Sequence, residues 1–213
     1  MSNTIATVSQ GPARTRLLKI LVACSYQRAE DDRFELASGR RSNFYIDCKA
    51  TTMRGDAMPL IGELVAELIP ADIDSVGGLT MGADPIALAT AFWCTSALRA
   101  MNAFTVRKEP KGHGLMKFIE GCPGTTVAVV DDVVTTGGST IKAIQKCHDA
   151  GIRVGAAVVL VDRQEGGMEE VRAAVGPAVP VRSVFTRTDL ERQWQAVRAD
   201  ADPVSSRPRA SHG

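Results

Sequence analysis

Two adjacent carboxylates and a loop rich in threonine and glycine follow one apolar run of the chain. Residues Val129–Thr140 read VVDDVVTTGGST. The glycines of the loop Thr135–Ser139 allow successive backbone N–H groups to turn toward an anion, and the hydroxyls of this loop add further donors. The helix expected after the loop contributes unpaired N–H groups and the positive end of its dipole. This pattern is typical of a site for a phosphate monoester.

The two carboxylates add a second chemistry to the same place. Asp131 and Asp132, when ionised, are acceptors that suit the vicinal hydroxyls of a ribose or the water shell of a magnesium ion. The simpler alternative is a strand-to-helix turn with Thr and Ser as caps and solvated aspartates, and the Thr-Gly-Gly-Ser sequence alone favours it. Two acids that end a buried strand, where parallel sheets bind their ligands, reverse this preference.

The loop is not a nucleotide-binding motif of the common kinds. No Gly-Lys-Ser/Thr follows it, and no Gly-x-Gly-x-x-Gly occurs in the chain. ATP hydrolysis and dinucleotide binding are therefore disfavoured.

Two further polar segments follow expected strands. Residues Arg107–Gly114 read RKEPKGHG, with four potential cations within seven positions, and the glycines and the proline predict a mobile loop. Composition alone favours a solvated charge run there. Residues Asp162–Glu165 read DRQE. Without other motifs, Arg163 is best explained as a surface arginine beside two acids.

The elements that must position these groups alternate between strand and helix. The expected strands are Ser75–Leu79, Ala103–Arg107, Thr126–Val130, Val154–Val161 and Val181–Thr186. The expected helices are Pro59–Ile69, Pro85–Leu98, Ser139–Ala150 and Met168–Val175. Strands that are apolar throughout are buried on both faces, which indicates a parallel sheet flanked by helices. The alternation predicts an α/β fold with right-handed crossovers.

The two ends of the chain lie outside this alternation. The N-terminal part predicts a helix around Ala13–Ser25, a polar stretch at Glu30–Asn43 and a strand at Phe44–Asp47. We assign residues 1–50 to this N-terminal segment, 51–198 to the core and 199–213 to a tail. The tail has hardly an apolar residue, so we expect it to be disordered.

Composition excludes several classes of protein. The chain has 213 residues, with 25 Lys+Arg against 24 Asp+Glu and a net charge of +1, which opposes general nucleic-acid binding. Its five cysteines form no C-x-x-C pair, so neither a disulfide framework nor a zinc site is indicated. No run has the length of a membrane span or a signal peptide. We expect a soluble, cytoplasmic protein with no membrane and no nucleic-acid partner.

Several of these segments resemble one family. Val129–Thr140 resembles the phosphoribosyl-pyrophosphate motif of type I phosphoribosyltransferases, and Arg107–Gly114 resembles the catalytic loop of the orotate phosphoribosyltransferases. Asp162–Glu165 is similar to that family's Asp-Arg-Gln-Glu segment. Phe34–Asp47 is similar to its N-terminal segment over the base, and Gly77–Pro85 to its second diphosphate-binding turn. The likeness spans about residues 10–190.

The resemblance implies a type I phosphoribosyltransferase fold, with a central mostly parallel sheet flanked by helices and a small N-terminal hood over the base. It implies transfer of the phosphoribosyl group from phosphoribosyl pyrophosphate to orotate, giving orotidine 5′-monophosphate and pyrophosphate in de novo pyrimidine biosynthesis. It also implies Mg²⁺ that is carried by the diphosphate substrate without direct protein ligands, and a homodimer that shares the catalytic loop across its interface.

The same resemblance assigns roles to residues. Catalytic roles fall to Lys111, His113, Asp131 and Asp132. Substrate contacts fall to these four and to Phe44, Tyr45, Arg107, Lys108, Val133, Val134, Thr135, Thr136, Gly137, Gly138, Ser139 and Arg163. In this assignment the loop Thr135–Ser139, called the phosphate loop below, holds the 5′-phosphate. The loop Arg107–Gly114, called the cationic loop below, holds the diphosphate, and Arg163 contacts orotate. A bidentate guanidinium suits the carboxylate that distinguishes orotate from uracil.

The chain departs from the family pattern at two positions. Ala37 and Gly82 stand where many relatives have lysines that contact the substrate. Arg40, Arg41 and Lys49 are nearby cations that could replace them, and the sequence leaves open which one does.

Two other functions are open at this point. A purine phosphoribosyltransferase would share the phosphate loop, but it has no reason to carry the Arg107–His113 pattern or Arg163. A regulator that senses phosphoribosyl pyrophosphate and binds nucleic acid would need a basic face or an added module. A net charge of +1 and the lack of a spare domain oppose that function.

Overall fold

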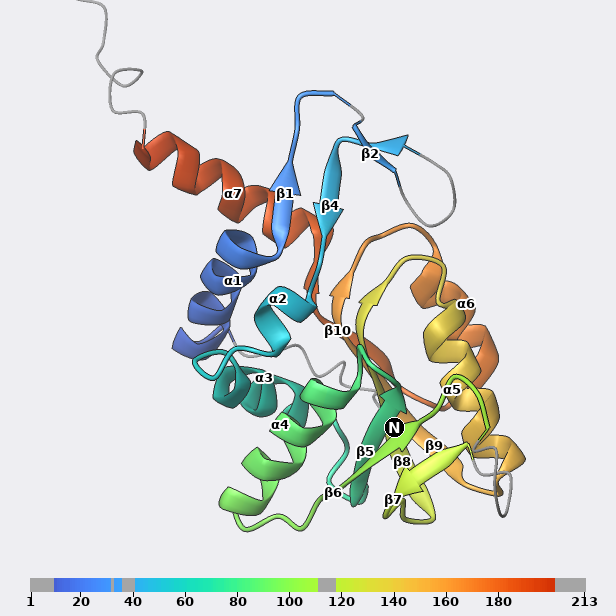
Figure 1. The fold of residues 1–213 in the computed structure, drawn as a ribbon. Coiled ribbons are helices and arrows are strands. Elements are labelled where there is room, and N and C mark those ends of the chain that lie inside the picture. Colours follow the sequence, from blue (N-terminus) through green and yellow to red (C-terminus); the bar gives the residue numbers. More distant parts are fainter. Residues whose placement is uncertain (1–9, 32, 36–40, 111–117, 202–213) are drawn as a thin grey trace, which may run out of the picture.

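The computed structural model describes residues 10–31, 33–35, 41–110 and 118–201 of the chain (Figure 1). Its centre is a six-stranded sheet with the strand order β10-β9-β8-β5-β6-β7. The strands are β5 (Ser75–Leu79), β6 (Asn102–Val106), β7 (Ile119–Gly121), β8 (Thr126–Val134), β9 (Arg153–Asp162) and β10 (Val181–Thr186). All neighbouring strands are parallel except β7, which pairs antiparallel with β6 at the edge. The predicted mostly parallel sheet is confirmed.

Helices cover both faces of this sheet. Figure 1 shows α1 (Pro12–Cys24), α3 (Met58–Ala66) and α4 (Asp84–Ser96) on one side, and α5 (Gly138–Asp149) and α6 (Gly167–Val175) on the other. Alternate side chains of β8 serve the two layers: Ala128 and Val130 pack with the first group, while Val127 and Val129 pack with the second. All four are fully buried, which explains why this strand is apolar without interruption.

The predicted strands and helices lie within a few residues of those observed. The strand expected at Thr126–Val130 continues to Val134, because β8 pairs with β9 in register as far as Val134 and Asp162. Asp131 and Asp132 therefore lie inside the last part of strand β8, where it still pairs with β9, instead of in the loop beyond the strand. This difference fixes the direction in which each carboxylate points.

The largest element that the sequence pattern did not predict is α7 (Arg187–Ala201). Its mean hydropathy is low, and its attachment depends on a few side chains, among them Leu190, which is fully buried. The helix includes residues 199–201, which were assigned to the tail. Residues 202–213 of that tail lie outside the described residues.

Two short antiparallel ribbons form the N-terminal hood. One pairs β1 (Tyr26–Arg28) with β4 (Phe44–Ile46), and the other pairs β2 (Phe34–Glu35) with β3 (Arg41–Ser42). They project beyond one end of the sheet, next to α2 (Lys49–Thr52) and α7 (Figure 1).

A polar contact joins the hood to α7. The Tyr26 hydroxyl donates to a Glu191 carboxylate oxygen at 2.6 Å, and Arg28 lies 2.9 Å from the same oxygen. Burial, with the neighbouring carboxylate of Glu191, raises the pKa of Tyr26 to about 12. Tyr26 therefore stays protonated and donates this hydrogen bond at all physiological pH values.

Among the helices that the structure describes, none is long and apolar enough to cross a membrane.

Candidate functional site

Asp131 is the most deeply buried acid of the site. Its Oδ2 accepts a hydrogen bond from the Thr140 hydroxyl at 2.7 Å, and its Oδ1 accepts one from the backbone N–H of Asp132 at 3.0 Å. Burial raises the pKa of Asp131 from 3.8 to about 7, and the charge of Asp132 adds to the rise while the Thr140 hydrogen bond opposes it. Asp131 therefore keeps its proton to a higher pH than an exposed carboxyl group does.

Asp132 has a different set of partners. Its Oδ1 accepts from the backbone N–H of Val133 at 2.9 Å, and its Oδ2 lies 3.3 Å from Nζ of Lys49. The Asp132 side chain is 8% exposed, whereas that of Lys49 is 46% exposed. The cation therefore covers the buried carboxylate on the solvent side.

The space beside Asp132 explains the departure at position 82. A Cβ atom on Gly82 would lie 2.6 Å from Asp132 Oδ1. A lysine could not stand at this position unless Asp132 moved. Of the three substitute cations suggested by the sequence, Lys49 lies next to the acids, Arg41 is exposed in β3, and Arg40 lies outside the described residues.

The two acids contact residues from opposite faces of the sheet. Thr140, the partner of Asp131, belongs to α5 on one face of the sheet. Lys49 and Gly82, next to Asp132, belong to α2 and to the turn before α4 on the other face. This follows from the period of two residues along β8. The strand end thus presents one carboxylate on each side.

The predicted phosphate loop Thr135–Ser139 connects β8 to α5. Gly137 stands immediately before the helix with φ of 81°, a left-handed conformation that favours glycine. Thr136, Gly138 and Ser139 are exposed at the start of α5, and no described side chain caps this helix end. The N–H groups of its first turn are therefore available to an anion.

A second glycine lets α6 pack against this loop. A Cβ on Gly167 would lie 2.5 Å from the Thr135 carbonyl oxygen and 2.8 Å from the Gly137 nitrogen. The start of α6 thereby supports the phosphate loop from behind.

The base of the cationic loop lies at the edge of the sheet, between β6 and β7. The N–H of Arg107 donates to the Phe118 carbonyl at 2.7 Å and closes the base of the loop. Lys142 of α5 donates to the Lys108 carbonyl at 3.1 Å, and Nζ of Lys146 lies 4.1 Å from the centre of the Phe118 ring. These contacts dock the loop base on the helix that follows the phosphate loop. Lys111 and His113 lie outside the described residues.

The turn that resembles the second diphosphate site is held by its own polar contacts. Asp84, the first residue of α4, accepts hydrogen bonds from the hydroxyls of Thr80 at 2.6 Å and Thr105 at 2.9 Å. The Thr80 N–H donates to the Val106 carbonyl at 2.8 Å, and the Thr80–Met81 peptide is cis. The turn is thus fixed to the neighbouring strand β6.

Arg163 comes to the same end of the sheet directly after β9. Its N–H donates to the Val134 carbonyl at 3.0 Å, which places it beside the phosphate loop. Its side chain is almost fully buried, and Nε donates to Glu165 Oε1 at 2.9 Å. Nη2 lies 2.9 Å from the same oxygen as an ion pair, but it makes no hydrogen bond to the described residues.

The two hood aromatics have different surroundings. Phe44 is buried, with the guanidinium groups of Arg163 at 4.7 Å and Arg187 at 5.2 Å from its ring centre. Tyr45 is 39% exposed and stacks on Phe34 at 6.0 Å. Neighbours on a strand point to opposite faces, so these two rings do not form a single platform. Phe44 is the ring next to Arg163, and contact of either ring with a base stays a prediction.

Sequence reasoning missed four residues that shape the site: Thr140, Lys142, Gln164 and Arg187. Thr140 had a signal, since a buried hydroxyl one turn into the helix after an acid pair can reach back to it. Arg187 had none, because its place beside Phe44 depends on the unpredicted α7. Gln164, whose backbone φ is 58°, had no signal in its residue type.

No family model matches the chain. The chain is 41% identical over 180 residues to the orotate phosphoribosyltransferase of Aquifex aeolicus, a match that covers 83% of this chain and 97% of that protein. It is similar to the crystal structure of Mycobacterium tuberculosis orotate phosphoribosyltransferase in complex with Fe(III) dicitrate. That likeness has a TM-score of 0.72 and 37% identity, and it covers 84% of this chain and 99% of the other. A complex of the M. tuberculosis enzyme with 5-phospho-α-D-ribosyl 1-diphosphate gives a TM-score of 0.66, 31% identity, and coverages of 84% and 92%.

Proposed function

Since the chain belongs to the orotate phosphoribosyltransferase family, we propose that its donor substrate binds along the end of β8 and its base beside Arg163. The reaction transfers the phosphoribosyl group from phosphoribosyl pyrophosphate to orotate and gives orotidine 5′-monophosphate and pyrophosphate, in de novo pyrimidine biosynthesis. One observation carries the proposed arrangement. The 3.0 Å hydrogen bond from Arg163 N–H to the Val134 carbonyl joins the candidate base site to the strand that ends in the phosphate loop.

The 5′-phosphate of the donor binds at the loop Thr135–Ser139. The exposed start of α5 supports this assignment, because its free N–H groups and its dipole favour an anion. Asp131 and Asp132 hold the ribose hydroxyls, with Val133 and Val134 as the backbone between acids and loop. Lys49 provides the cation that the family pattern has at position 82, and its ion pair with Asp132 supports this role.

Orotate binds with its carboxylate toward Arg163. The buried Nη2 group supports this role: it is ion-paired with Glu165 at 2.9 Å but makes no hydrogen bond to the described residues, so its N–H is free to donate to a ligand oxygen. The Phe44 ring packs against the same guanidinium, with its centre 4.7 Å away. Phe44, the hood ring next to Arg163, lies against the base. Contact of Tyr45 with the base stays a prediction, because Tyr45 points to the opposite face of β4.

The diphosphate leaves toward the cationic loop. Arg107, Lys108, Lys111 and His113 offset the negative charge that grows on the leaving group as the bond to the ribose breaks. His113 donates a proton to it.

A Mg²⁺ ion bound to the diphosphate would supply positive charge to the leaving group. Within the described residues, no group of three His, Cys, Asp or Glu side chains could hold a metal ion, while the oxygens of Asp131 and Asp132 suit a hydrated Mg²⁺. The acid pair would thus hold the water shell of a Mg²⁺ ion, which we expect the diphosphate to carry.

The protein works as a homodimer that shares the cationic loop. The surface beside the loop base supports this proposal. Leu88 and Phe92 on α4 are 64% and 77% exposed. Leu88 lines a hollow of about 160 Å³ together with residues of β6 and β7, including Thr105 and Glu120. Exposed apolar patches of this kind mark protein contacts.

A cytoplasmic location fits the buried thiols of Cys48 and Cys147.

Steady-state turnover of the purified protein tests the arrangement. We expect consumption of phosphoribosyl pyrophosphate that depends on orotate and on Mg²⁺, and a KM for orotate that rises at least about tenfold in Arg163→Lys, because Lys cannot form the bidentate pair. Turnover with adenine or hypoxanthine in place of orotate would contradict the activity. An unchanged KM in Arg163→Lys would contradict the base site alone.

A further inference from the structure

The loop that carries Arg163 contains a strained backbone position. Gln164 has φ of 58°, in the left-handed region that L-residues other than Gly, Asn and Asp rarely adopt. The loop has glycines at 166 and 167, but residue 164 itself is a glutamine. Such a backbone conformation is stable only when the contacts of the residue offset the strain.

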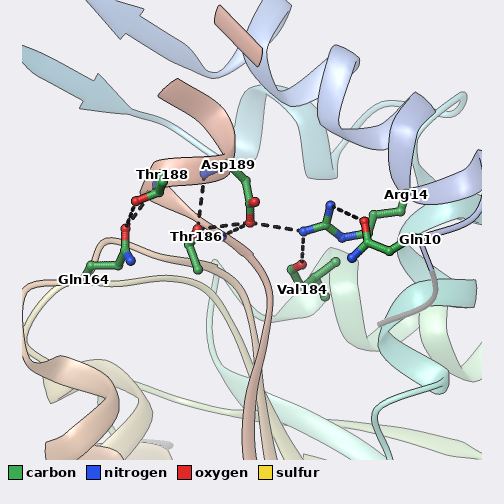
Figure 2. A network of polar contacts seen from close by, with 7 residues as sticks. All are labelled: Gln10, Arg14, Gln164, Val184, Thr186, Thr188 and Asp189. Atoms are coloured by element: carbon green, nitrogen blue, oxygen red, sulfur yellow. Dashed lines mark hydrogen bonds and ion pairs between the residues drawn. The ribbon is translucent and has the colours of Figure 1, made fainter. Parts of the chain in front are cut away.

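The Gln164 side chain makes two such contacts with the start of α7. Its Oε1 accepts hydrogen bonds from the Thr188 hydroxyl at 2.6 Å and from the Thr188 backbone N–H at 3.1 Å (Figure 2). The Gln164 backbone N–H donates to Asp162 Oδ1 at 2.7 Å. The residue is therefore held through both its backbone and its side chain. We call the pair Gln164 and Thr188 the clasp.

The partner side of the clasp is itself anchored. The Asp189 carboxylate accepts from the N–H of Thr186 at 2.9 Å and from its hydroxyl at 3.0 Å, which caps the start of α7. Arg14 of α1 donates to the same carboxylate at 3.1 Å and to the Val184 carbonyl at 3.4 Å. Figure 2 shows these contacts as one network around the start of α7. The backbone of Thr188 is thus held in place between Thr186 and Asp189.

Hydrogen bonds fix the backbone of Arg163 and the residue that follows it. On one side its N–H is bonded to Val134, and on the other side its neighbour Gln164 is held by the clasp. A change at Gln164 that releases its left-handed conformation rotates the peptide between the two residues and moves the Arg163 side chain. The first residue of α7, Arg187, also packs on the Phe44 ring that Arg163 faces.

We propose that the clasp positions Arg163 for the carboxylate of orotate, so that the start of α7 belongs to the machinery of base recognition. Gln164 and Thr188 act through Arg163 and are positioning residues. This inference rests on the proposed role of Arg163 at the base site.

Thr188→Val tests the clasp, because it removes the hydroxyl donor and keeps the shape of the side chain and the backbone N–H. We expect KM for orotate to rise about 3- to 10-fold, the size of one lost hydrogen bond, with KM for phosphoribosyl pyrophosphate within about twofold of wild type. Thr188→Ser, which keeps the hydroxyl, restores KM for orotate. Gln164→Ala, which removes the acceptor, reproduces the effect of Thr188→Val and covers the case in which that variant fails to fold.

Thr15→Val is the matched control, because among the described residues the Thr15 hydroxyl donates only to the carbonyl of Gly11, just before α1, at 3.4 Å. Arg163→Lys is measured in parallel. A raised KM for orotate in Arg163→Lys with wild-type values in Thr188→Val and Gln164→Ala overturns the clasp and leaves the base site standing. A wild-type KM in Arg163→Lys overturns both. Equal rises in both substrate KM values that Thr188→Ser does not restore indicate general loosening and also overturn the clasp.

Discussion

At the scale of single residues, the ionisation of Asp131 links the site to the stability of the fold. Its pKa is raised to about 7 by burial, so the folded protein binds a proton there between about pH 4 and 7 that the unfolded chain has released. The contribution to stability is present in full below about pH 4 and is lost as the pH rises through about 7. Burial of Asp131 therefore lowers the stability of the fold at neutral pH relative to acidic pH.

Asp131→Asn removes this titration and keeps the shape of the side chain. We expect the free energy of unfolding in urea to fall between pH 5 and 8 in the wild type, and to fall less in the variant, because the neutral amide gives up no proton. Asp149→Asn is the control, since the Asp149 side chain is 65% exposed. Parallel pH curves for wild type and Asp131→Asn would show that the Asp131 pKa is not raised.

Lys49 gives a second prediction at this scale. In Lys49→Met the charge beside Asp132 is lost, and we expect KM for phosphoribosyl pyrophosphate to rise about tenfold, the size of one charge-assisted hydrogen bond. KM for orotate stays near its wild-type value, and Lys49→Arg recovers part of the loss. Lys19→Met, at an exposed position of α1, is the control. If Lys49→Met leaves the donor KM unchanged, the cation at this site comes from elsewhere.

The site residues differ in how far the sequence predicts them. The acid pair and the phosphate loop are one continuous segment, so their arrangement follows from local structure that a pattern can predict. The contact between Lys49 and Asp132 spans 83 residues. The sequence narrowed that cation to three candidates, and the choice among them depends on the packing of α2 and on the space at Gly82.

At the scale of elements, the close packing of α6 on the phosphate loop matters most. A Cβ on Gly167 would lie 2.5 Å from the Thr135 carbonyl, so Gly167→Ala must displace the loop or the helix. We expect a loss of about 1–3 kcal/mol in the free energy of unfolding, typical of overpacking, and a raised KM for phosphoribosyl pyrophosphate. Gly55→Ala is the control, because nothing lies within 4 Å of its Cβ position. If Gly167→Ala keeps the wild-type KM for phosphoribosyl pyrophosphate, the packing of α6 does not contribute to binding of this substrate.

The elements also show where a sequence pattern stops being informative. Buried parallel strands such as β8 and β9 have continuous apolar runs, and their helices have clear periodicity, so both were predicted. The helix α7 buries Leu190, packs Trp194 against the core, and has mostly polar or small residues elsewhere. Its position is fixed by contacts to distant segments, such as Arg14 to Asp189 and Tyr26 to Glu191. No local window of the sequence contains those partners.

At the scale of the whole molecule, the near-neutral chain separates its charges. The cationic loop begins and ends at the outer edge of the sheet, where Arg107 and Phe118 close its base. The acids lie at the end of β8, two strands from β6, where the loop begins. A loop rooted at an open edge is accessible to a second copy of the chain, and the exposed Leu88 lies beside the same edge.

Mixing two inactive variants tests whether the loop is shared. Lys111→Ala disables the loop and keeps the acids, while Asp131→Asn with Asp132→Asn disables the acids and keeps the loop. If each site takes its loop from the partner, a mixed dimer has one complete site. Random pairing then restores about a quarter of wild-type activity, because half of the dimers are mixed and half of their sites are complete. We expect this recovery after the two proteins are unfolded and refolded together, with each protein refolded alone as the control. A mixture as inactive as its parts would show that the loop serves its own chain, since a loop acting within one subunit leaves no site in the mixture complete.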